Sequence, residues 1–307
     1  MTAAIEVRGL VKHYDTVEAV RGIDLTIEES EVFALLGPNG AGKTTTVEIL
    51  EGHRRRTDGT VSVLGLDPER GGRDLRERIG IVLQSAGIEP ELTVREALRT
   101  YAALYTRPRG VDEVIELVGL DDKADARIKH LSGGQQRRLD LGLGLIGDPE
   151  LIFLDEPTTG FDPSARRRAW ALVSSLRSLG RTILLTTHYM DEAQALADRV
   201  AVIAAGRILA EGPPGALTGP EGELSTTIRF RLPPDVGLED LPGRFADAAV
   251  AVDGGVEVTT GQPTTMLHAL TSWAMQRDLE LEQLTVTRPN LEEVYLALTA
   301  RAESDRG

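Results

Sequence analysis

The segment "GPNGAGKT" at residues 37–44 has the residue types and the spacing of a phosphate-binding loop. It matches the pattern G-x-x-x-x-G-K-[ST] between the apolar run "EVFALL" and a helical pattern, which is the context that this motif requires. Glycines let the backbone curl around phosphate oxygens, the lysine neutralises the outer phosphates and the hydroxyl can hold Mg²⁺. We therefore predict a nucleotide site, with Thr44 as a Mg²⁺ ligand, rather than a plain glycine-rich turn. Its binding residues are Gly37, Pro38, Asn39, Gly40, Ala41, Gly42, Lys43, Thr44 and Thr45.

Two acidic residues follow an apolar run in "LIFLDEP", and α/β proteins place ligands at such strand ends. Asp155 is positioned to reach Mg²⁺, directly or through water, as a second metal anchor. Glu156 would then be free to orient or deprotonate an attacking water, with Lys43 on the phosphates. Two acids at a strand end are an ordinary solvated feature, but beside a phosphate loop they become candidate catalytic residues.

A second candidate phosphate cradle occurs in "LSGGQQRRLD" at residues 131–140. Ser132 and Gln135 have the spacing of a capping box, so they predict a helix that begins here. The free backbone N–H groups at such a helix start bind anions. The local capping function and anion binding are compatible. We therefore include Ser132, Gly133, Gly134 and Gln135 among the candidate nucleotide-binding residues.

The elements that must position these residues alternate between short apolar runs and helical patterns, up to about residue 215. The runs "EVFALLG", "RIGIVLQ", "LIFLDEP" and "RTILLTTH" are apolar on both faces, which is typical of parallel strands buried between helices. We therefore predict an α/β core. Charged helical sequence interrupts it over about 85–130, and with the helix that follows it predicts an inserted helical subdomain of about 85–145. A capping box at Thr93 and Glu96 lies within this segment.

A boundary is predicted in "AEGPPGALTGPEGELS" (210–225), which is rich in glycine and proline. Residues 1–215 would form the nucleotide-binding domain and residues 216–307 a small α+β domain. In the second domain "STTIRFRL", "GVEVTT" and "LEQLTVTRP" are typical of strands, "TTMLHALTSWAMQRD" of a helix, and Asn290 and Glu293 predict a capped last helix. From Glu221 onward there are 7 arginines, no lysine and 15 acidic residues, and no catalytic cluster that we recognise.

The composition excludes several classes of function. The chain has no cysteine, so it has no disulfides, thiolate metal sites or cysteine nucleophiles. Its net charge of −14 argues against nucleic acid as a partner, because such proteins usually carry a basic face. There is no apolar signal segment and no apolar run long enough to span a membrane, so we expect a cytoplasmic protein.

The order and proximity of "LSGGQQRRL" and "LIFLDEP" resemble the ATP-binding cassette (ABC) ATPases, and the likeness covers about the first 215 residues. It implies a P-loop cassette with a RecA-like core sheet and a helical subdomain, which hydrolyses ATP with Mg²⁺. Four residues match lesser motifs of the family. They are Gln84 at the Q-loop (catalytic and metal-binding), Asp162 in "TTGFD", His188 at the switch histidine (catalytic), and Tyr14 at the adenine-stacking aromatic. Alone, three of them have an ordinary interpretation: Gln84 as a loop amide, His188 as a structural histidine and Tyr14 as an edge-strand aromatic. Their joint order favours function.

The resemblance also explains why one chain would have two cradles. In ABC ATPases two cassettes pair head to tail, and each "LSGGQ" segment closes over the γ-phosphate held by the other phosphate loop. We therefore expect an ATP-dependent dimer, with a homodimer as the first expectation. The sequence departs from the family at Ser30, where glycine is usual, at Phe161, where leucine is usual, and at Gly142 and Gly144, where alanines are common. Glycines inside a helix indicate close packing or a softer helix.

Within the family, the chain most resembles the ATP-binding subunits of ABC-2 type exporters of the daunorubicin-resistance kind. The segments that carry this are "FALLGPNGAGKTTT", "LGLDP" and the tail "RPNLEEVYLALT". The resemblance implies that the chain powers export of a drug-like or lipid-like substrate through a separate membrane permease, on the inner face of the cell membrane. The second domain would regulate or stabilise the dimer. The alternative is a soluble ABC-type ATPase that acts as a regulator or on ribosomes or nucleic acid.

Overall fold

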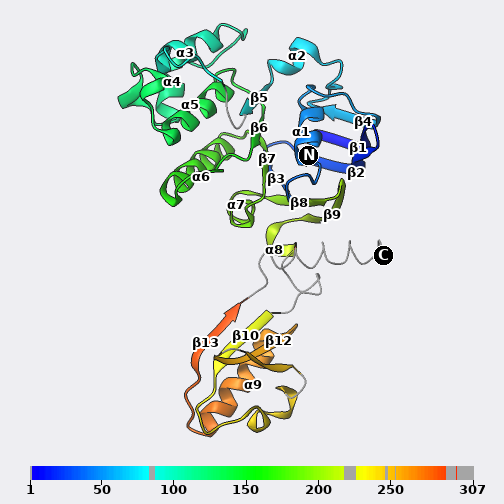
Figure 1. Cartoon of the computed structure of the whole chain (residues 1–307), viewed down its shortest axis with the longest axis vertical. Helices are drawn as coiled ribbons and strands as arrows, with labels where there is room; N and C mark the ends of the chain where they lie inside the picture. Colours follow the sequence, from blue (N-terminus) through cyan, green and yellow to red (C-terminus); the bar gives the residue numbers. More distant parts are fainter. Residues whose placement is uncertain are drawn as a thin grey trace. The chain divides into compact units, whose positions relative to one another are not determined.

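The structure of this chain is a computed structural model that describes residues 2–82, 87–217, 226–245, 248–252, 254–287 and 295. It divides into two compact units, Met1–Pro214 and Gly215–Gly307 (Figure 1). Within the described ranges, no helix is both long enough and apolar enough to cross a membrane.

A six-stranded sheet forms the centre of the first unit, in the order β5-β6-β7-β3-β8-β9. Its strands are β5 (Ile79–Val82), β6 (Leu151–Asp155), β7 (Thr182–Thr187), β3 (Val32–Leu36), β8 (Arg199–Ala204) and β9 (Arg207–Gly212). All neighbours are parallel except β8 and β9. The four apolar runs become β3, β5, β6 and β7, and β3 and β7 are buried along their whole length. The prediction of a parallel α/β core is confirmed.

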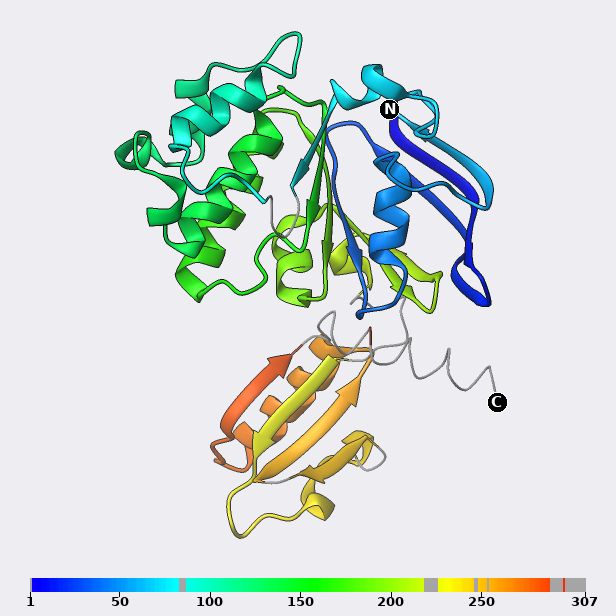
Figure 2. The ribbon, with the colours of Figure 1, turned by 45° about the horizontal axis from the view of Figure 1, so that its top comes forward.

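Helices cover both faces of this sheet (Figure 2). On one face lies α1 (Lys43–Leu50), and on the other lie α6 (Pro163–Ser178) and α7 (Met190–Leu196). Gly180, which adopts a φ of 73°, follows the end of α6. Parallel strands buried between two helix layers explain why the runs are apolar on both faces.

A second, antiparallel sheet of order β2-β1-β4 packs over α1, and the sequence analysis did not anticipate it. Its strands are β1 (Ala3–Tyr14), β2 (Val17–Glu28) and β4 (Asp58–Val63). Their inward residues, such as Val7 and Leu25, share one core with α1 and the central sheet. That core also contains Val47 of α1, Phe33 of β3 and Leu184 of β7. The short helix α2 (Gly72–Arg76) precedes β5.

The inserted subdomain between β5 and β6 is helical, as predicted, with α3 (Val94–Ala102), α4 (Val111–Leu117) and α5 (Gly133–Leu145). Two short 3₁₀ turns, 121–123 and 128–130, connect α4 to α5. Both predicted capping boxes are present: Thr93 with Glu96 begins α3, and Ser132 with Gln135 begins α5. The capping residues therefore fix where both helices begin.

Of the two glycines in the second half of α5, Gly144 is explained by close packing. A Cβ on Gly144 would lie 2.5 Å from Val82 Cγ2 on β5, and a Cβ on Gly80 would lie 2.1 Å from the Gly144 carbonyl oxygen. At Gly142 the nearest atom would be Val114 Cγ1 at 3.3 Å. The helix and strand approach so closely at Gly144 that no side chain fits between them.

We expect Gly144→Ala to lower the free energy of unfolding by about 1–3 kcal/mol, because the added methyl overpacks the contact with Val82. Gly142→Ala is the matched control, since its added methyl meets only the ends of side chains. Replacing a glycine within a helix by alanine stabilises the helix by about 0.5–1 kcal/mol. Urea denaturation compares the two. Equal stability of both variants would contradict the close approach.

The structure also accounts for the departure at Ser30, which follows β2. Ser30 has a φ of 63°, a conformation that glycine adopts most easily. Its N–H donates to Thr182 Oγ1 at 2.9 Å, and its hydroxyl donates to the Gly180 carbonyl at 3.0 Å. These two bonds hold the turn against β7 without a glycine.

The second unit contains a four-stranded antiparallel sheet of order β11-β12-β10-β13, with one long helix. The strands are β10 (Thr226–Arg231), β11 (Ala249–Val252), β12 (Gly255–Thr260) and β13 (Glu282–Thr287), and the helix is α9 (Pro263–Gln276). A short helix, α8 (Pro214–Leu217), lies at the division between the units. The core includes Phe230, Phe245 and Leu270. The α+β prediction is confirmed, although β11 was not anticipated; the predicted cap at Asn290 and Glu293 lies outside the described residues.

Candidate nucleotide site

The phosphate loop runs from the end of β3 to the start of α1, and its glycines are required by their surroundings. A Cβ on Gly37 would lie 2.2 Å from the Ile203 carbonyl oxygen, and one on Gly42 would lie 2.6 Å from the Ala19 carbonyl oxygen. Gly40 and Gly42 also have φ values of 80° and 105°. The loop is therefore held closely against β8 and β2 in a conformation that only glycines permit.

The ammonium group of Lys43 lies inside this loop. Lys43 Nζ donates to the carbonyl oxygens of Gly37 at 2.7 Å and Pro38 at 3.1 Å, and its side chain is 6% exposed. It lies 4.0 Å from Glu156 Oε1. Burial lowers the pKa of Lys43, and the nearby carboxylates of Glu156 and Asp155 oppose that shift. A phosphate in the loop would meet a positive charge with little competing water.

Asp155 ends β6 and is fixed by the neighbouring strand. Thr186 on β7 donates its hydroxyl to Asp155 Oδ1 at 2.5 Å. The same Thr186 Oγ1 accepts the backbone N–H of Glu156 at 3.1 Å. One side chain therefore positions both acidic residues.

Glu156 has a strained backbone and a well-fixed side chain. Its φ is 44°, in the left-handed region that non-glycine residues rarely adopt, at a cost of about 1–3 kcal/mol. Its Oε1 lies 3.2 Å from His188 Nδ1, and its Oε2 accepts from Thr159 Oγ1 at 3.1 Å. With its side chain only 13% exposed, the carboxylate points toward the phosphate loop beside Lys43. The structure thus brings together Lys43, Asp155, Glu156 and His188.

The site residues fit a nucleotide and a Mg²⁺ ion. At Gly37 and Gly42 the cradle leaves no space for a side chain, and Thr44 and Asp155 offer the oxygen ligands that Mg²⁺ prefers. Over the described ranges, no three His, Asp or Glu side chains gather into a metal site of their own. A Mg²⁺ ion here would depend on phosphate oxygens for much of its coordination, which is usual for this ion.

A buried carboxyl group lies at Glu51, directly after the end of α1. Its side chain is 3% exposed, and its Oε2 lies 3.1 Å from His53 Nδ1. Burial, with smaller contributions from Asp155 and Glu48, raises its pKa from 4.5 to about 8. The folded chain therefore holds this proton more tightly than the unfolded chain.

From this shift we expect the free energy of unfolding, measured without nucleotide or Mg²⁺, to fall as the pH rises from about 4.5 to about 8. In Glu51→Gln that slope should be reduced, and at pH 8.5 the variant should be more stable than the wild type by on the order of 1–3 kcal/mol. Urea denaturation at several pH values measures this. A variant less stable than the wild type at pH 8.5 would contradict the buried, neutral carboxyl.

The second cradle is open toward solvent at the start of α5. Ser132 Oγ accepts from Gln135 N at 3.3 Å, and Gln135 Oε1 accepts from Ser132 N at 2.8 Å. A Cβ on Gly133 would meet nothing within 4 Å, and one on Gly134 would first meet Ala165 at 4.0 Å. Unlike Gly37 and Gly42, these glycines are not required by packing within the chain. They leave room for a group that approaches from outside.

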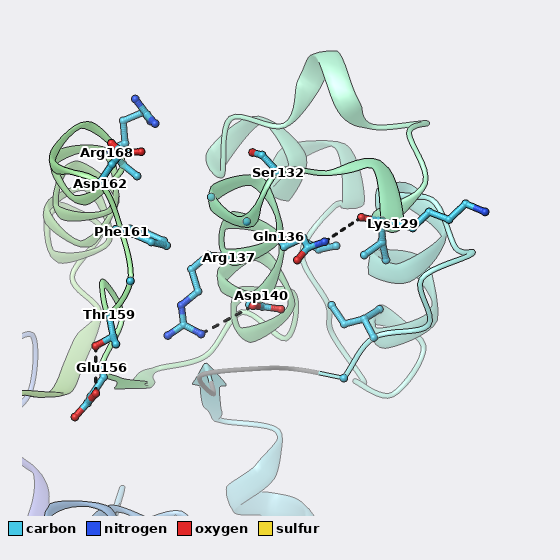
Figure 3. Close-up of a pocket in the computed structure, with 18 of the residues that line it drawn as sticks. Lys129, Ser132, Gln136, Arg137, Asp140, Glu156, Thr159, Phe161, Asp162 and Arg168 are labelled. Carbon is cyan, nitrogen blue, oxygen red and sulfur yellow. Dashed lines mark hydrogen bonds and ion pairs between the residues drawn. The ribbon is translucent and has the colours of Figure 1, made fainter. Parts of the chain in front are cut away.

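A cavity of about 810 Å³ lies between the start of α5 and the loop after β6 (Figure 3). Glu156, at the end of β6, lines it on one side, and Ser132 with Arg137 on α5 lines the other. Phe161, which replaces the usual leucine, also lines it. No residue of the phosphate loop lines this cavity.

The remaining predicted residues are placed as follows. Asp162 is the N-cap of α6 and accepts from the N–H groups of Ser164 and Ala165, both at 2.8 Å, and these bonds lower its pKa. Tyr14 ends β1, with the cations of Lys12 and Arg54 at 4.9 and 5.2 Å from its ring centre. Gln84 lies outside the described residues.

Three residues in the site were missed by sequence reasoning: Thr186, Thr159 and Arg137. Thr186 and Thr159 fix the acidic residues through hydroxyl groups, and Arg137 donates to the backbone beside them. Thr159 lies within "TTGFD" and Arg137 within "LSGGQQRRLD", but neither was singled out in these segments. Thr186 lies two residues before His188, and only that closeness could have drawn attention to it.

The sequence matches known families in both units. Residues 20–159 match the ABC transporter family, and residues 226–290 match the C-terminal domain of ABC transporter domain-containing proteins. The chain is 38% identical to the daunorubicin/doxorubicin resistance ATP-binding protein DrrA of Streptomyces peucetius, covering 99% of this chain and 95% of DrrA. It is 37% identical to the Nod factor export ATP-binding protein I of Burkholderia lata, covering 99% of each.

Solved structures agree with the fold of the first unit. The cbiO1 protein of Clostridium perfringens, part of the ABC transporter complex cbiONQ, is 29% identical with a TM-score of 0.63, over 70% of this chain and 90% of cbiO1. A dimeric post-hydrolysis structure of the ATP-binding cassette MJ0796 with ADP and phosphate has a TM-score of 0.61 at 24% identity, over 68% and 98% of the two chains. With the full-length similarity to DrrA, these findings show that the chain is an ATPase that belongs to the ABC transporter family, among its ATP-binding proteins.

Proposed function

We propose that two copies of this chain bind two ATP molecules between them and power export through a separate membrane permease. The observation that carries the proposal is the pair of cradles. One encloses Lys43 beside Glu156, and the other, at Gly133 and Gly134, is open to an approaching group. Because no residue of the phosphate loop lines the cavity beside Gly133 and Gly134, the second cradle is available to the nucleotide of another copy.

In the proposed site Lys43 neutralises the outer phosphates, and the other residues of 37–45 except Pro38 surround them with backbone N–H groups. Mg²⁺, held by Thr44, Asp155 and Gln84, would neutralise charge on the phosphate oxygens. Tyr14 stacks on the adenine ring. The cation of Arg54, which lies 5.2 Å from the centre of the Tyr14 ring, then either moves away or stays on the other face of that ring.

Glu156 is the proposed general base that orients the attacking water and accepts its proton. His188 Nδ1, at 3.2 Å, and Thr159 Oγ1, at 3.1 Å, fix the two carboxylate oxygens. Gln84 completes the proposed catalytic set, with Lys43 stabilising charge as the phosphoryl group transfers. This arrangement supports hydrolysis of the outer phosphate.

The partner chain would complete the site from the open side. Its Ser132, Gly133, Gly134 and Gln135 would approach the outer phosphate with a hydroxyl and helix N–H groups, and its Asp162 loop would lie alongside. Loss of the outer phosphate on hydrolysis removes the group that joins the two chains, so the pair would open.

The transport role rests on relatives whose names refer to daunorubicin and doxorubicin resistance and to Nod factor export. We propose that this chain likewise drives export of a drug-like or lipid-like substrate, at the cytoplasmic face of the membrane. The helical subdomain would contact the permease, and residues 216–307 would regulate or stabilise the dimer.

Co-purification tests the transport role. The tagged chain is isolated from membranes of its own cells in mild detergent with ATP present, and bound proteins are identified. A polytopic membrane protein in a two-to-two ratio is expected. Recovery of ribosomes, nucleic acid or only soluble proteins would contradict the transport role and favour the soluble alternative.

A further inference from the structure

Arg137 extends from α5 to the backbone on both sides of Glu156 (Figure 3). Its Nη2 donates to the Asp155 carbonyl oxygen at 3.1 Å, and its Nε donates to the Pro157 carbonyl oxygen at 3.3 Å. The side chain is 8% exposed. One planar group thus holds the residue before Glu156 and the residue after it.

Asp140 lies on the same face of α5 as Arg137, as expected for residues three apart. Its Oδ2 is 3.9 Å from Arg137 Nη1, and its side chain is 12% exposed. The carboxylates of Asp155 on β6 and Glu192 on α7 are also near enough to stabilise the guanidinium charge. A buried cation requires such partners, so the guanidinium is held in one orientation.

The segment that Arg137 holds is strained. Glu156 keeps its φ of 44° only because surrounding bonds over-determine it. From β7, Thr186 accepts the Glu156 N–H through its carbonyl and its hydroxyl, both at 3.1 Å. From α5, Arg137 supplies the two bonds to the flanking carbonyls. The direction of the Glu156 carboxylate therefore depends on both elements.

We propose that Arg137 is a positioning residue for ATP hydrolysis, which aims Glu156 by holding the carbonyl groups of Asp155 and Pro157. Because Arg137 is on the helix that begins at Ser132, it also ties the second cradle of a chain to the Glu156 of the same chain. If α5 shifts when a phosphate binds at Ser132, the two hydrogen bonds from Arg137 would transmit that shift to the backbone around Glu156. The inference rests on the proposed role of Glu156 as the general base.

The test is Arg137→Lys, which keeps the charge but cannot hold both carbonyl groups with a rigid fork. We expect kcat for ATP hydrolysis to fall at least tenfold, since small displacements of a catalytic group cost about a hundredfold, whereas KM for ATP stays within about twofold. Arg138→Lys is the matched control. Arg138 donates to the carbonyls of Val118 and Gly119 within the helical subdomain, so its loss should leave kcat close to the wild-type value.

A double variant separates positioning from a general structural role. Because Arg137 acts only through Glu156, adding Arg137→Lys to Glu156→Gln should not lower the residual kcat further. The inference would be overturned if Arg137→Lys kept the wild-type kcat, or if its kcat fell only as much as that of Arg138→Lys. A further fall of kcat in the double variant, relative to Glu156→Gln, would also overturn it. If Glu156→Gln itself hydrolyses ATP normally, the proposed role of Glu156 fails instead.

Discussion

Replacing Glu156 by glutamine should leave ATP binding intact and reduce turnover at least about a thousandfold, with the protein trapped as an ATP-bound dimer. Glutamine keeps the size of the side chain and a hydrogen-bonding oxygen, but it cannot accept a proton from water. The contacts to His188 and Thr159, at 3.2 and 3.1 Å, would orient the amide much as they orient the carboxylate. Without hydrolysis, the outer phosphate remains and continues to join the two chains.

Steady-state phosphate release and size-exclusion chromatography with ATP measure these two effects. Glu150→Gln is the control, because Glu150 precedes β6 and pairs with Arg78 at 2.6 Å at the other end of the strand. That variant should hydrolyse ATP normally and remain able to dissociate. Normal turnover in Glu156→Gln would remove Glu156 from the mechanism.

Lys43→Ala should weaken nucleotide binding itself, by about a hundredfold or more, because it removes the buried positive charge that faces the phosphates. Turnover would be lost as a consequence. Calorimetry or fluorescence titration with ATP and Mg²⁺ measures the affinity directly.

Lys123→Ala is the control for this change. Lys123 lies at the surface with Asp122 at 3.5 Å, so its loss should leave ATP affinity unchanged. A melting temperature shows that Lys43→Ala is folded, since Lys43 also bonds the carbonyls of Gly37 and Pro38. A folded Lys43→Ala protein with normal ATP affinity would contradict the assignment of this loop.

Much of the fold follows from local patterns. The runs that became β3, β5, β6 and β7 are apolar on both faces, which distinguishes them from amphipathic helices. Capping boxes located the starts of α3 and α5, because a cap depends only on residues three apart. The phosphate loop was identified from its spacing for the same reason.

The antiparallel sheet was missed partly because β4 pairs with β1 over a long distance in the sequence, with Ile5 opposite Val63. The strands β1 and β2 are neighbours in the chain and form a hairpin in which Tyr14 pairs with Val17, but the sequence analysis did not predict this hairpin. Their alternating pattern indicates a strand but not the strand beside it.

The residues of the site could be predicted from the sequence only in part, for a related reason. Lys43, Glu156 and His188 were predicted as site residues from motifs, but the residues that contact them do so through three-dimensional proximity. Thr186 lies 31 residues from Asp155, and Arg137 lies 18 residues from it. A threonine in a strand and an arginine in a helix have ordinary roles in any sequence, so their function appears only when the strands and α5 are assembled.

Cross-linking between two cradles tests the central claim most directly. The chain has no cysteine, so Asn39→Cys and Ser132→Cys, each in a Glu156→Gln background, provide one thiol per protein. The two proteins are mixed with ATP and Mg²⁺ or with ADP, and treated with a short bis-maleimide. We expect a covalent dimer that joins the two different variants with ATP and little of it with ADP. Equal cross-linking in ATP and ADP, or none with ATP, would contradict a site completed by the partner chain.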